Sequence, residues 1–163
     1  MCSSFFYRIM NMNEKWMREA IKQAIKAEQK DEVPIGCVIV KEDHILARAY
    51  NQREQKQVST AHAEILAIEK ACKKLGSWRL DGCELYVTLE PCPMCTGAII
   101  QSRIDKVYFG AYDFKGGCLG SNTNLLDVKG FNHYPEVEGG LLQEECASLL
   151  TSFFRKKRKS KKS

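Results

Sequence analysis

The chain has 163 residues, 44% of them hydrophobic and 28% charged, which suits one globular domain with a core of its own. No run of about eighteen apolar residues occurs, and the first residues lack the order of a secretory signal, so we expect neither a membrane span nor export. The eight cysteines include one C-x-x-C pair, and we interpret the others as buried free thiols. Free thiols indicate a reducing compartment, so we expect a cytoplasmic protein.

The net charge of +5 comes from the end of the chain. Residues 155–163 hold seven of the 25 basic residues and no acidic one, which leaves 18 basic against 20 acidic residues elsewhere. A short basic tail of this kind is usually solvated and disordered. Its functional alternative is a non-specific, salt-dependent contact with phosphates.

Hydrophobic periodicity predicts an alternation of helices and strands. We expect a helix over 13–29, a hairpin of strands 35–41 and 45–51 around Glu42 and Asp43, a polar loop over 52–59, a helix over 61–75, a strand over 84–89, a helix over 93–102, a strand over 105–110 and a helix over 141–155. Thr60 is the expected N-cap of the second helix. Residues 112–135 are rich in Gly and Asn and form a long loop, which in a compact domain is usually functional. The alternation implies one layered α/β domain with helices on both faces of the sheet.

Two short motifs carry chemistry: His-Ala-Glu at 62–64 and Pro-Cys-Pro-Met-Cys at 91–95. A structural zinc site takes four protein ligands, whereas a catalytic one takes three and leaves a position for water. His62, Cys92 and Cys95 supply three ligands, and Glu64 is a carboxylate left free to carry a proton. The two cysteines are three apart, so on a helix they share one face. The motifs therefore predict an open, hydrolytic site with one Zn²⁺ per subunit.

Two other classes of protein are compatible with parts of this pattern. A lone C-x-x-C that follows a strand and opens a helix is typical of thiol redox proteins. A zinc ion can also hold together a non-catalytic RNA-binding module, in which the basic tail would do the binding. The H-x-E motif upstream favours hydrolysis over redox chemistry, and a pure binding module has no use for Glu64.

H-x-E followed by P-C-x-x-C is the signature of the zinc nucleobase deaminases. From about residue 13 to 155 the chain resembles, more narrowly, the bacterial-type tRNA adenosine deaminase (TadA) family. The segments that carry this resemblance are V-P-I-G-C-V-I-V at 33–40, A-Y-N-Q-R at 49–53, T-A-H-A-E at 60–64, G-A-Y-D at 110–113, K-G-G-C-L-G-S at 115–121 and F-F-R at 153–155.

This resemblance implies a cytidine-deaminase-like fold, a three-layer α/β/α arrangement with a mixed sheet. It implies hydrolytic deamination of adenosine to inosine at the wobble position of tRNA anticodon loops, by a homodimer. The chain then divides into an N-terminal extension at 1–12, a deaminase domain at 13–155 and a basic tail at 156–163. A zinc deaminase of a free cytosine or guanine compound is the alternative, and the G-A-Y-D and F-F-R segments favour tRNA.

The resemblance also implies a set of residues around the base. Asn51 would hydrogen-bond the flipped nucleotide, although an Asn at a strand end is also an ordinary turn residue. Val33 and Pro34 would wall the base pocket, or equally form an edge of the core. The backbone N–H of either Ala63 or Cys92 would hold the attacking or leaving group.

A second set would contact the rest of the RNA. Asp113 and Lys115 match a stretch that contacts the backbone of the anticodon loop, and Asn132 is added to them. Phe153 and Arg155 lie near the end of the last helix, which touches RNA in the family. Phe153 has the alternative of being a core residue.

Overall fold

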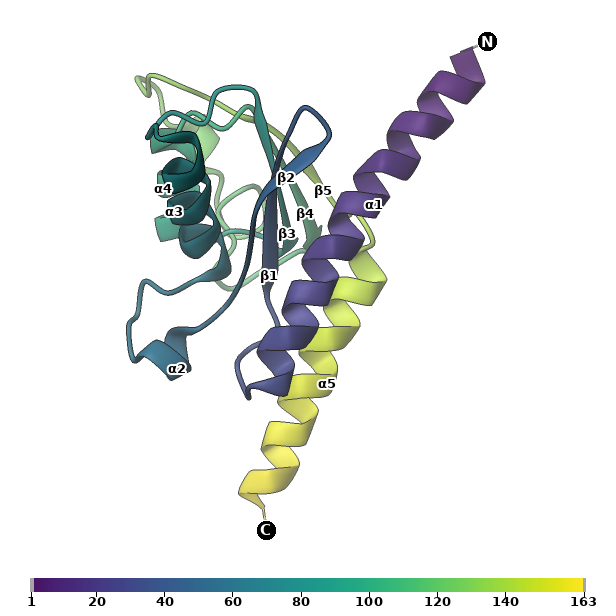
Figure 1. The fold of residues 1–163 in the computed structure, drawn as a ribbon. Helices are drawn as coiled ribbons and strands as arrows, with labels where there is room; N and C mark the ends of the chain where they lie inside the picture. Colours follow the sequence, from purple (N-terminus) through teal and green to yellow (C-terminus); the bar gives the residue numbers. More distant parts are fainter. Residues whose placement is uncertain (1, 163) are drawn as a thin grey trace.

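The computed structural model describes the backbone of residues 2–162 and, except at 2–3 and 8–11, their side chains. Its elements are α1 (Cys2–Gln29), β1 (Gly36–Lys41), β2 (His44–Tyr50), α2 (Arg53–Lys56), α3 (Ala63–Leu75), β3 (Cys83–Leu89), α4 (Pro93–Gln101), β4 (Lys106–Ala111), the 3₁₀ turn η1 (Leu125–Asp127), β5 (Glu136–Gly139) and α5 (Gln143–Lys161). Within these residues, five strands form one mixed sheet in the order β2-β1-β3-β4-β5 (Figure 1). Strand β1 pairs antiparallel with β2 and β3, whereas β3, β4 and β5 run parallel.

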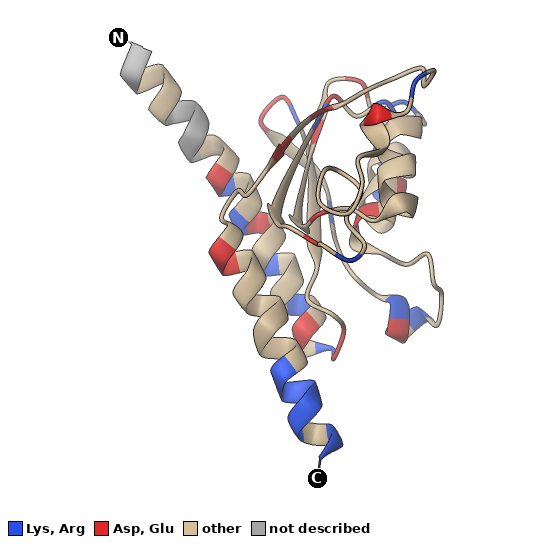
Figure 2. Ribbon diagram, turned by 180° about the vertical axis from the view of Figure 1, so that it is seen from behind, with Lys and Arg blue, Asp and Glu red and all other residues tan. Residues whose placement is uncertain are grey.

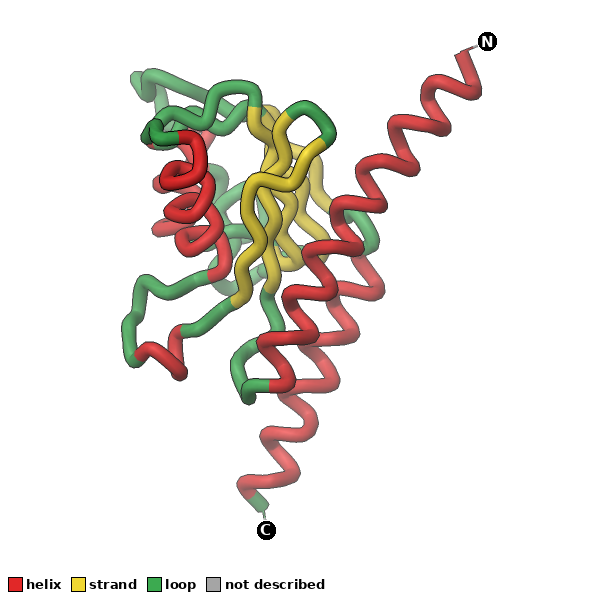
Figure 3. The backbone as a smooth tube through the Cα atoms, in the orientation of Figure 1, coloured by secondary structure: helices red, strands yellow, loops and turns green. Residues whose placement is uncertain are grey.

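Helices cover both faces of this sheet. The helices α1 and α5 lie side by side on one face, and α3 and α4 cover the other (Figures 1 and 3). Successive residues of β1 point to opposite faces, so Val38 packs in the cluster under α1, and Ile39 packs in the cluster under α3 and α4. This is the three-layer α/β/α arrangement with a mixed sheet that the sequence predicted.

Gly36 allows helix α1 to approach the sheet closely. A Cβ atom at this position would overlap the backbone of Ala20 and Ala24, both fully buried on the inner face of α1. The side chain of Met17, one turn earlier, is also fully buried. The small residues of α1 therefore set its distance from β1.

The topology brings two helix N-termini to one edge of the sheet. Strand β2 is antiparallel to β1, which is antiparallel to β3, so the carboxyl ends of β2 and β3 lie at the same edge. Strand β2 leads to the start of α3, and β3 leads to the start of α4. In α/β sheets this edge is the usual place for a ligand.

The two ends of the chain differ from the sequence-based expectation. Helix α1 begins at Cys2 rather than near residue 13, and α5 runs to Lys161, so the prediction of a disordered basic tail was wrong. Lys and Arg favour helices, and cations near a helix C-terminus interact well with its dipole. Ion pairs from Lys156 to Glu28 and from Lys157 to Asp31 also join this part of α5 to the end of α1. Figure 2 shows the resulting basic end of α5.

Three short elements were not predicted, and one of them, η1, lies within the expected long loop 112–135. Helix α2 lies in the expected polar loop, and β5 follows the expected long loop as a fifth, edge strand. The hairpin turn was predicted correctly, and its two residues, Glu42 and Asp43, have φ values of 49° and 61°, as the tight turn between β1 and β2 requires. In the described residues, no helix is long and apolar enough to cross a membrane.

Candidate active site

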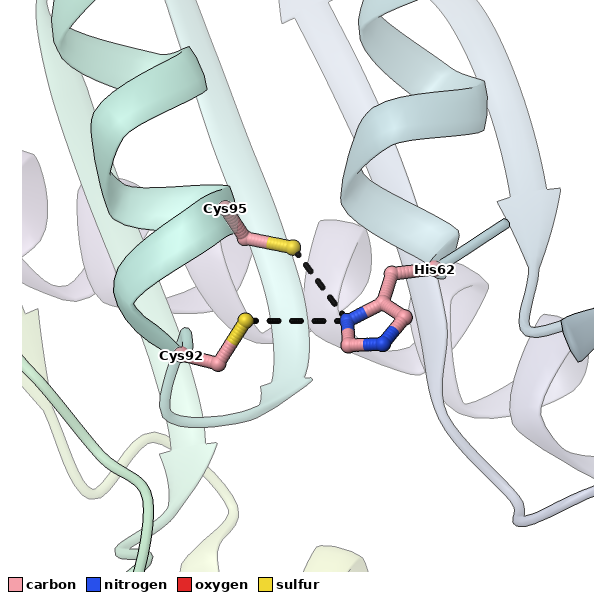
Figure 4. A group of neighbouring side chains, drawn as sticks. All are labelled: His62, Cys92 and Cys95. Carbon is pink, nitrogen blue, oxygen red and sulfur yellow. Dashed lines mark hydrogen bonds between the residues drawn. The ribbon is translucent and has the colours of Figure 1, made fainter. Parts of the chain in front are cut away.

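His62 and Cys92 occupy equivalent positions in two helices. His62 is the N-cap residue of α3 and Cys92 that of α4, and both have extended backbones. The prediction of Thr60 as the N-cap of α3 was therefore wrong by two residues. Pro93 follows Cys92 in the first turn of α4, where its lack of an N–H costs no helical hydrogen bond. Cys95 lies one turn after Cys92 and faces the same point (Figure 4).

The donor atoms of these three residues have the spacing of a tetrahedral metal site. The Nδ1 atom of His62 lies 3.7 Å from the Sγ atom of Cys92 and 3.5 Å from that of Cys95 (Figure 4). Zn–S bonds of about 2.3 Å and Zn–N bonds of about 2.0–2.1 Å place tetrahedral N and S ligands about 3.5 Å apart. The group could thus hold a metal ion. Among the described side chains (4–7 and 12–162), the group includes no fourth protein ligand, so a coordination position is left for a small molecule.

The protons of the group are shared among its members. The hydrogen bond from the Cys95 thiol, helped by His62, lowers the pKa of Cys92 to about 4. That same bond and burial raise the pKa of Cys95, and the hydrogen bond with Cys92 raises the pKa of His62. Metal ligands must be deprotonated, so a bound cation would take the place of these protons.

Glu64 lies in the first turn of α3 and is only 4% exposed. Burial raises the pKa of its carboxyl group, which moves the group toward the range useful for proton transfer near neutral pH. It lines a cavity of about 120 Å³ together with Val33, Ile35, Asn51, Arg53, His62 and Ala63. The cavity therefore brings together one candidate metal donor (His62), the predicted proton carrier (Glu64) and three of the predicted base contacts.

The side chain of Asn51 holds the wall of this cavity. Its Nδ2 atom donates to the carbonyl oxygen of Val33 at 3.3 Å, and its Oδ1 atom accepts from the N–H of Arg53 at 3.2 Å. Pro34 is buried directly beyond Val33 and is not among the lining residues. Arg53 and Ile35 line the cavity and were missed by the sequence analysis, although both lie within the segments that carry the resemblance.

The loop after β4 contains Asp113 and Lys115. The Oδ1 atom of Asp113 accepts from the backbone N–H groups of Lys115 and Gly116, at 3.0 and 3.1 Å, so this carboxylate shapes its own turn. The N–H of Cys118 donates to the carbonyl oxygen of Pro91 at 2.9 Å. The loop is thereby joined to the segment that carries the cysteine ligands.

Glu90 also holds the loop after β4 to the segment that contains Cys92 and Cys95. The sequence analysis did not single out this residue. Its carboxylate is 2% exposed and accepts from the backbone N–H groups of Asp113, Leu119 and Ser121, at 3.2, 3.0 and 3.1 Å. The Ser121 hydroxyl donates a fourth, short hydrogen bond. A Cβ atom on Gly117 would overlap this carboxylate, which explains the glycine there.

A larger groove adjoins the cavity. Its volume is about 510 Å³, and its lining residues are Lys30, Asp31, Val33, Glu54, Gln55, Phe153, Phe154, Lys157 and Lys161. Val33 lines both hollows, so the groove that Phe153 lines adjoins the cavity. Phe153 itself is only 6% exposed and packs against Phe154, as its alternative as a core residue predicted. Arg155 is exposed on α5 outside this lining.

The structure does not bring Asn132 to the other predicted residues. Asn132 precedes β5, and its neighbour His133 places its Nε2 atom 2.6 Å from the carbonyl oxygen of Ile104, directly before β4. The starts of β4 and β5 lie at the edge of the sheet opposite the carboxyl end of β3. Within one chain, Asn132 is thus on the far side from the metal donors.

Comparisons with known proteins agree with this geometry. Residues 11–158 match the family model of the MafB19-like deaminases. The chain is 59% identical over 153 residues to a tRNA-specific adenosine deaminase of Bacillus subtilis (strain 168), across 94% of this chain and 95% of that protein. It is 42% identical to a deaminase solved in work on A-to-I editing at the wobble position of transfer RNA, with a TM-score of 0.79 over 83% of this chain and 99% of that one. A guanine deaminase of Bacillus subtilis is 34% identical, with a TM-score of 0.60 over 77% of this chain and 83% of that one.

These matches cover nearly the whole described fold and include both motifs that supply the metal donors. The neighbours in structure are deaminases, so the sheet and its helices form a cytidine-deaminase-like fold. The chain belongs to the MafB19-like deaminase family and, within it, to the tRNA-specific adenosine deaminases.

Proposed function

We propose that this protein hydrolytically deaminates adenosine to inosine at the wobble position of tRNA anticodon loops. The observation that carries the proposal is the buried carboxylate of Glu64 in the same cavity as His62, beside an open group of three metal donors. The 59% identity to a named tRNA-specific adenosine deaminase supports the choice of substrate.

The metal of this proposal is one Zn²⁺ per subunit, held by His62, Cys92 and Cys95. One imidazole and two thiols are a ligand set that zinc prefers, and the N···S separations of 3.5 and 3.7 Å suit its tetrahedral geometry. When bound, zinc would supply a Lewis acid that lowers the pKa of a water to about 7.

Glu64 moves the protons in this proposal. Its carboxylate accepts a proton from the attacking water and delivers it to a nitrogen of the adenine ring as C6 is attacked. It then takes the proton of the new C6 hydroxyl and passes it to the exocyclic amine, which leaves as ammonia while the C6=O bond of inosine forms. The burial that raises the pKa of Glu64 suits it to both tasks. The backbone N–H of Ala63 or Cys92, at the starts of α3 and α4, faces the attacking or leaving group.

The base would lie against Val33, with Pro34 behind it, and Asn51 would position it. Because Asn51 already bonds the backbone at Val33 and Arg53, its first task is to hold the pocket wall. Phe153, which is buried, would support the exposed ring of Phe154 beside a neighbouring base, and Lys115 and Arg155 would offer a charge to phosphates. Asp113 would act through the turn that it shapes, and Asn132 would reach RNA only from a second subunit.

The protein is further proposed to be cytoplasmic and to form a homodimer. Light scattering on the purified zinc-loaded protein would test the dimer. A mass corresponding to one chain of 18.6 kDa would contradict the dimer. A monomer would also remove the route by which Asn132 contacts RNA.

The central test is inosine formation in an anticodon stem–loop with adenosine at the wobble position. Wild-type protein should form inosine at that position alone. The Glu64→Gln variant should keep its zinc and lose about 10²–10⁴-fold in rate, the usual contribution of general acid–base catalysis. Glu19→Gln is the matched control, since Glu19 pairs with Lys22 and Arg48 on another part of the surface.

Two outcomes would contradict the proposal. A zinc-loaded protein that leaves the stem–loop unchanged but deaminates guanine or a free cytosine compound would belong to the alternative activity. Full activity in a zinc-loaded Glu64→Gln variant would overturn the role of Glu64.

A further inference from the structure

The segment 53–60 is an exposed strap that begins and ends at the candidate active site. It connects Asn51 to His62, and both of these residues line the small cavity. Every side chain from Arg53 to Thr60 is exposed, and α2 within the segment has no buried residue. In Figures 1 and 3 the segment stands away from the sheet. No apolar side chain of its own therefore holds this strap on the protein.

A buried carboxylate holds it instead. Glu32 is 0% exposed, and its two carboxylate oxygens accept from the N–H of Glu54 at 2.9 Å and the N–H of Gln55 at 2.8 Å. Hydrogen bonds to an ionised acceptor are short and stronger than those between neutral groups. Where side chains are described, at 4–7 and 12–162, no lysine or arginine forms an ion pair with Glu32, and the strap supplies two hydrogen-bond donors to it.

This anchor lies between the two hollows of the surface. Arg53, at the start of α2, lines the cavity of about 120 Å³, whereas Glu54 and Gln55 line the groove of about 510 Å³. Val33, which follows Glu32 in the chain, lines both. One carboxylate therefore sets where the strap lies relative to the cavity and to the groove at once.

The groove has the chemistry of a single-stranded nucleic acid site. Phe154 provides an exposed aromatic ring, packed on the buried Phe153, and Lys30, Lys157 and Lys161 provide three positive charges against the two carboxylates of Asp31 and Glu54. Aromatic rings that stack on bases, beside lysines that contact phosphates, are the usual means of binding an unpaired strand. An RNA loop whose target base enters the cavity would continue into this groove along the strap.

We propose that Glu32 is a positioning residue that holds the strap 53–60 in place for an RNA strand passing from the cavity into the groove. The proposal rests on the proposed function for its substrate. It assigns Glu32 no contact with the reacting atoms, so loss of Glu32 weakens RNA binding without changing the chemical step.

The test is Glu32→Gln, which keeps the shape of the side chain. The amide nitrogen of glutamine is a donor, so it faces one of the two N–H groups of the strap without accepting from it. If the freed strap holds the bound position about a tenth of the time, binding weakens about tenfold. Accordingly, KM for the anticodon stem–loop should rise about tenfold, with kcat and zinc content unchanged. Glu19→Gln changes a glutamate on helix α1 whose ion-pair partners, Lys22 and Arg48, lie outside the strap, and it should change none of these values.

The length of the substrate separates positioning from a general defect. A trinucleotide centred on the target adenosine does not reach far into the groove, so its KM should change much less than that of the stem–loop. An equal rise in both values would contradict the bridging role of the strap. A fall in kcat with KM unchanged would do the same, because it would place Glu32 in the chemical step.

Two further measurements do not depend on turnover. In zinc-loaded protein carrying Glu64→Gln, fluorescence anisotropy should show about tenfold weaker binding of the stem–loop when Glu32→Gln is added. Hydrogen exchange should quicken at the amides of Glu54 and Gln55, and unchanged exchange there would refute the anchor. If wild-type protein binds the stem–loop without forming inosine, the proposed function fails while these results still decide the role of Glu32. Should Glu32→Gln not fold, Glu32→Asp, which shortens the carboxylate by one methylene, provides the same comparison.

Discussion

Replacement of Glu90 by glutamine should loosen the loop 112–121 from the segment that carries the cysteine ligands. The carboxylate accepts four hydrogen bonds, two at each oxygen. The amide nitrogen of glutamine accepts none, so its orientation decides the loss. Placed where Oε1 now lies, it can donate to the Ser121 hydroxyl, which turns from donor to acceptor, and only the N–H of Asp113 loses its partner. Placed at Oε2, it would leave the N–H groups of Leu119 and Ser121 both without an acceptor.

The first orientation is the less costly one and sets the magnitude. A buried backbone N–H without an acceptor costs about 1–3 kcal/mol, and this range is the upper bound here because the hydrogen bond of Asp113 is part-buried. For a chain of this length, that corresponds to a fall in Tm of roughly 2–12 °C. Urea unfolding and calorimetry measure both quantities, and hydrogen exchange should quicken first at Asp113.

A second substitution tests the assignment of the hydroxyl. Ser121→Ala alone removes one donor and leaves the carboxylate three partners. In the double variant, the amide nitrogen of Gln loses the hydroxyl that had accepted from it. The two changes together should thus cost more than their sum, by about 0.5–3 kcal/mol. The free energy of unfolding of Glu90→Gln could instead lie within about 0.5 kcal/mol of the wild-type value, as it does for ordinary surface changes. In that case the four hydrogen bonds do not stabilise the loop, and the reasoning is refuted.

Three more predictions follow from the metal donors and the packing of α1. Cys92→Ala should lower the zinc content, measured by mass spectrometry, by about tenfold or more, because zinc sites rely on each ligand. Cys146→Ala removes a buried free thiol and should keep its zinc, so an equal loss in both variants would contradict the site. Zinc affinity should fall as pH is lowered from about 8 to about 6, because His62 must lose its proton to bind and the hydrogen bond with Cys92 raises the pKa of His62. A competition titration would measure this affinity, and a profile that does not change with pH would argue against His62 as a ligand. Gly36→Ala should lower the free energy of unfolding, measured in urea, by about 1–3 kcal/mol, because the new Cβ atom overlaps the backbone of α1. Gly97→Ala lies in open space in α4 and should not lower it, so an equal loss of stability in both variants would refute the close approach.

The elements that the sequence predicted well are those set by local patterns. The hairpin turn at Glu42 and Asp43 and the start of α4 at Pro93 depend on a few adjacent residues. The grouping of His62 with Cys92 and Cys95, which could hold a metal ion, was predicted for a similar reason, since the two cysteines are one helical turn apart. Strand β5 was missed because it is short and two of its four residues are glutamates. It pairs with β4, which lies thirty residues earlier in the chain.

Burial and position within the fold are harder to obtain from sequence. Asp31 and Glu32 are adjacent acids in a charged stretch, yet the Asp31 side chain is 76% exposed and Glu32 is 0% exposed. Only the path of the strap after β2 makes one of them an anchor. Asn132 shows the same limit, because residue order in a long loop does not tell which edge of the sheet a residue reaches.

The N-cap positions of α3 and α4 have a consequence for how metal and fold depend on each other. A side chain at an N-cap usually stabilises its helix by about 0.5–2 kcal/mol through a bond to the first turn. His62 and Cys92, both within the described residues, make no such bond. Their side chains converge on a shared point between the helices instead (Figure 4). An ion at that point would fasten two otherwise uncapped helix starts to each other, so loading the metal and ordering the first turns of both helices would be a single equilibrium.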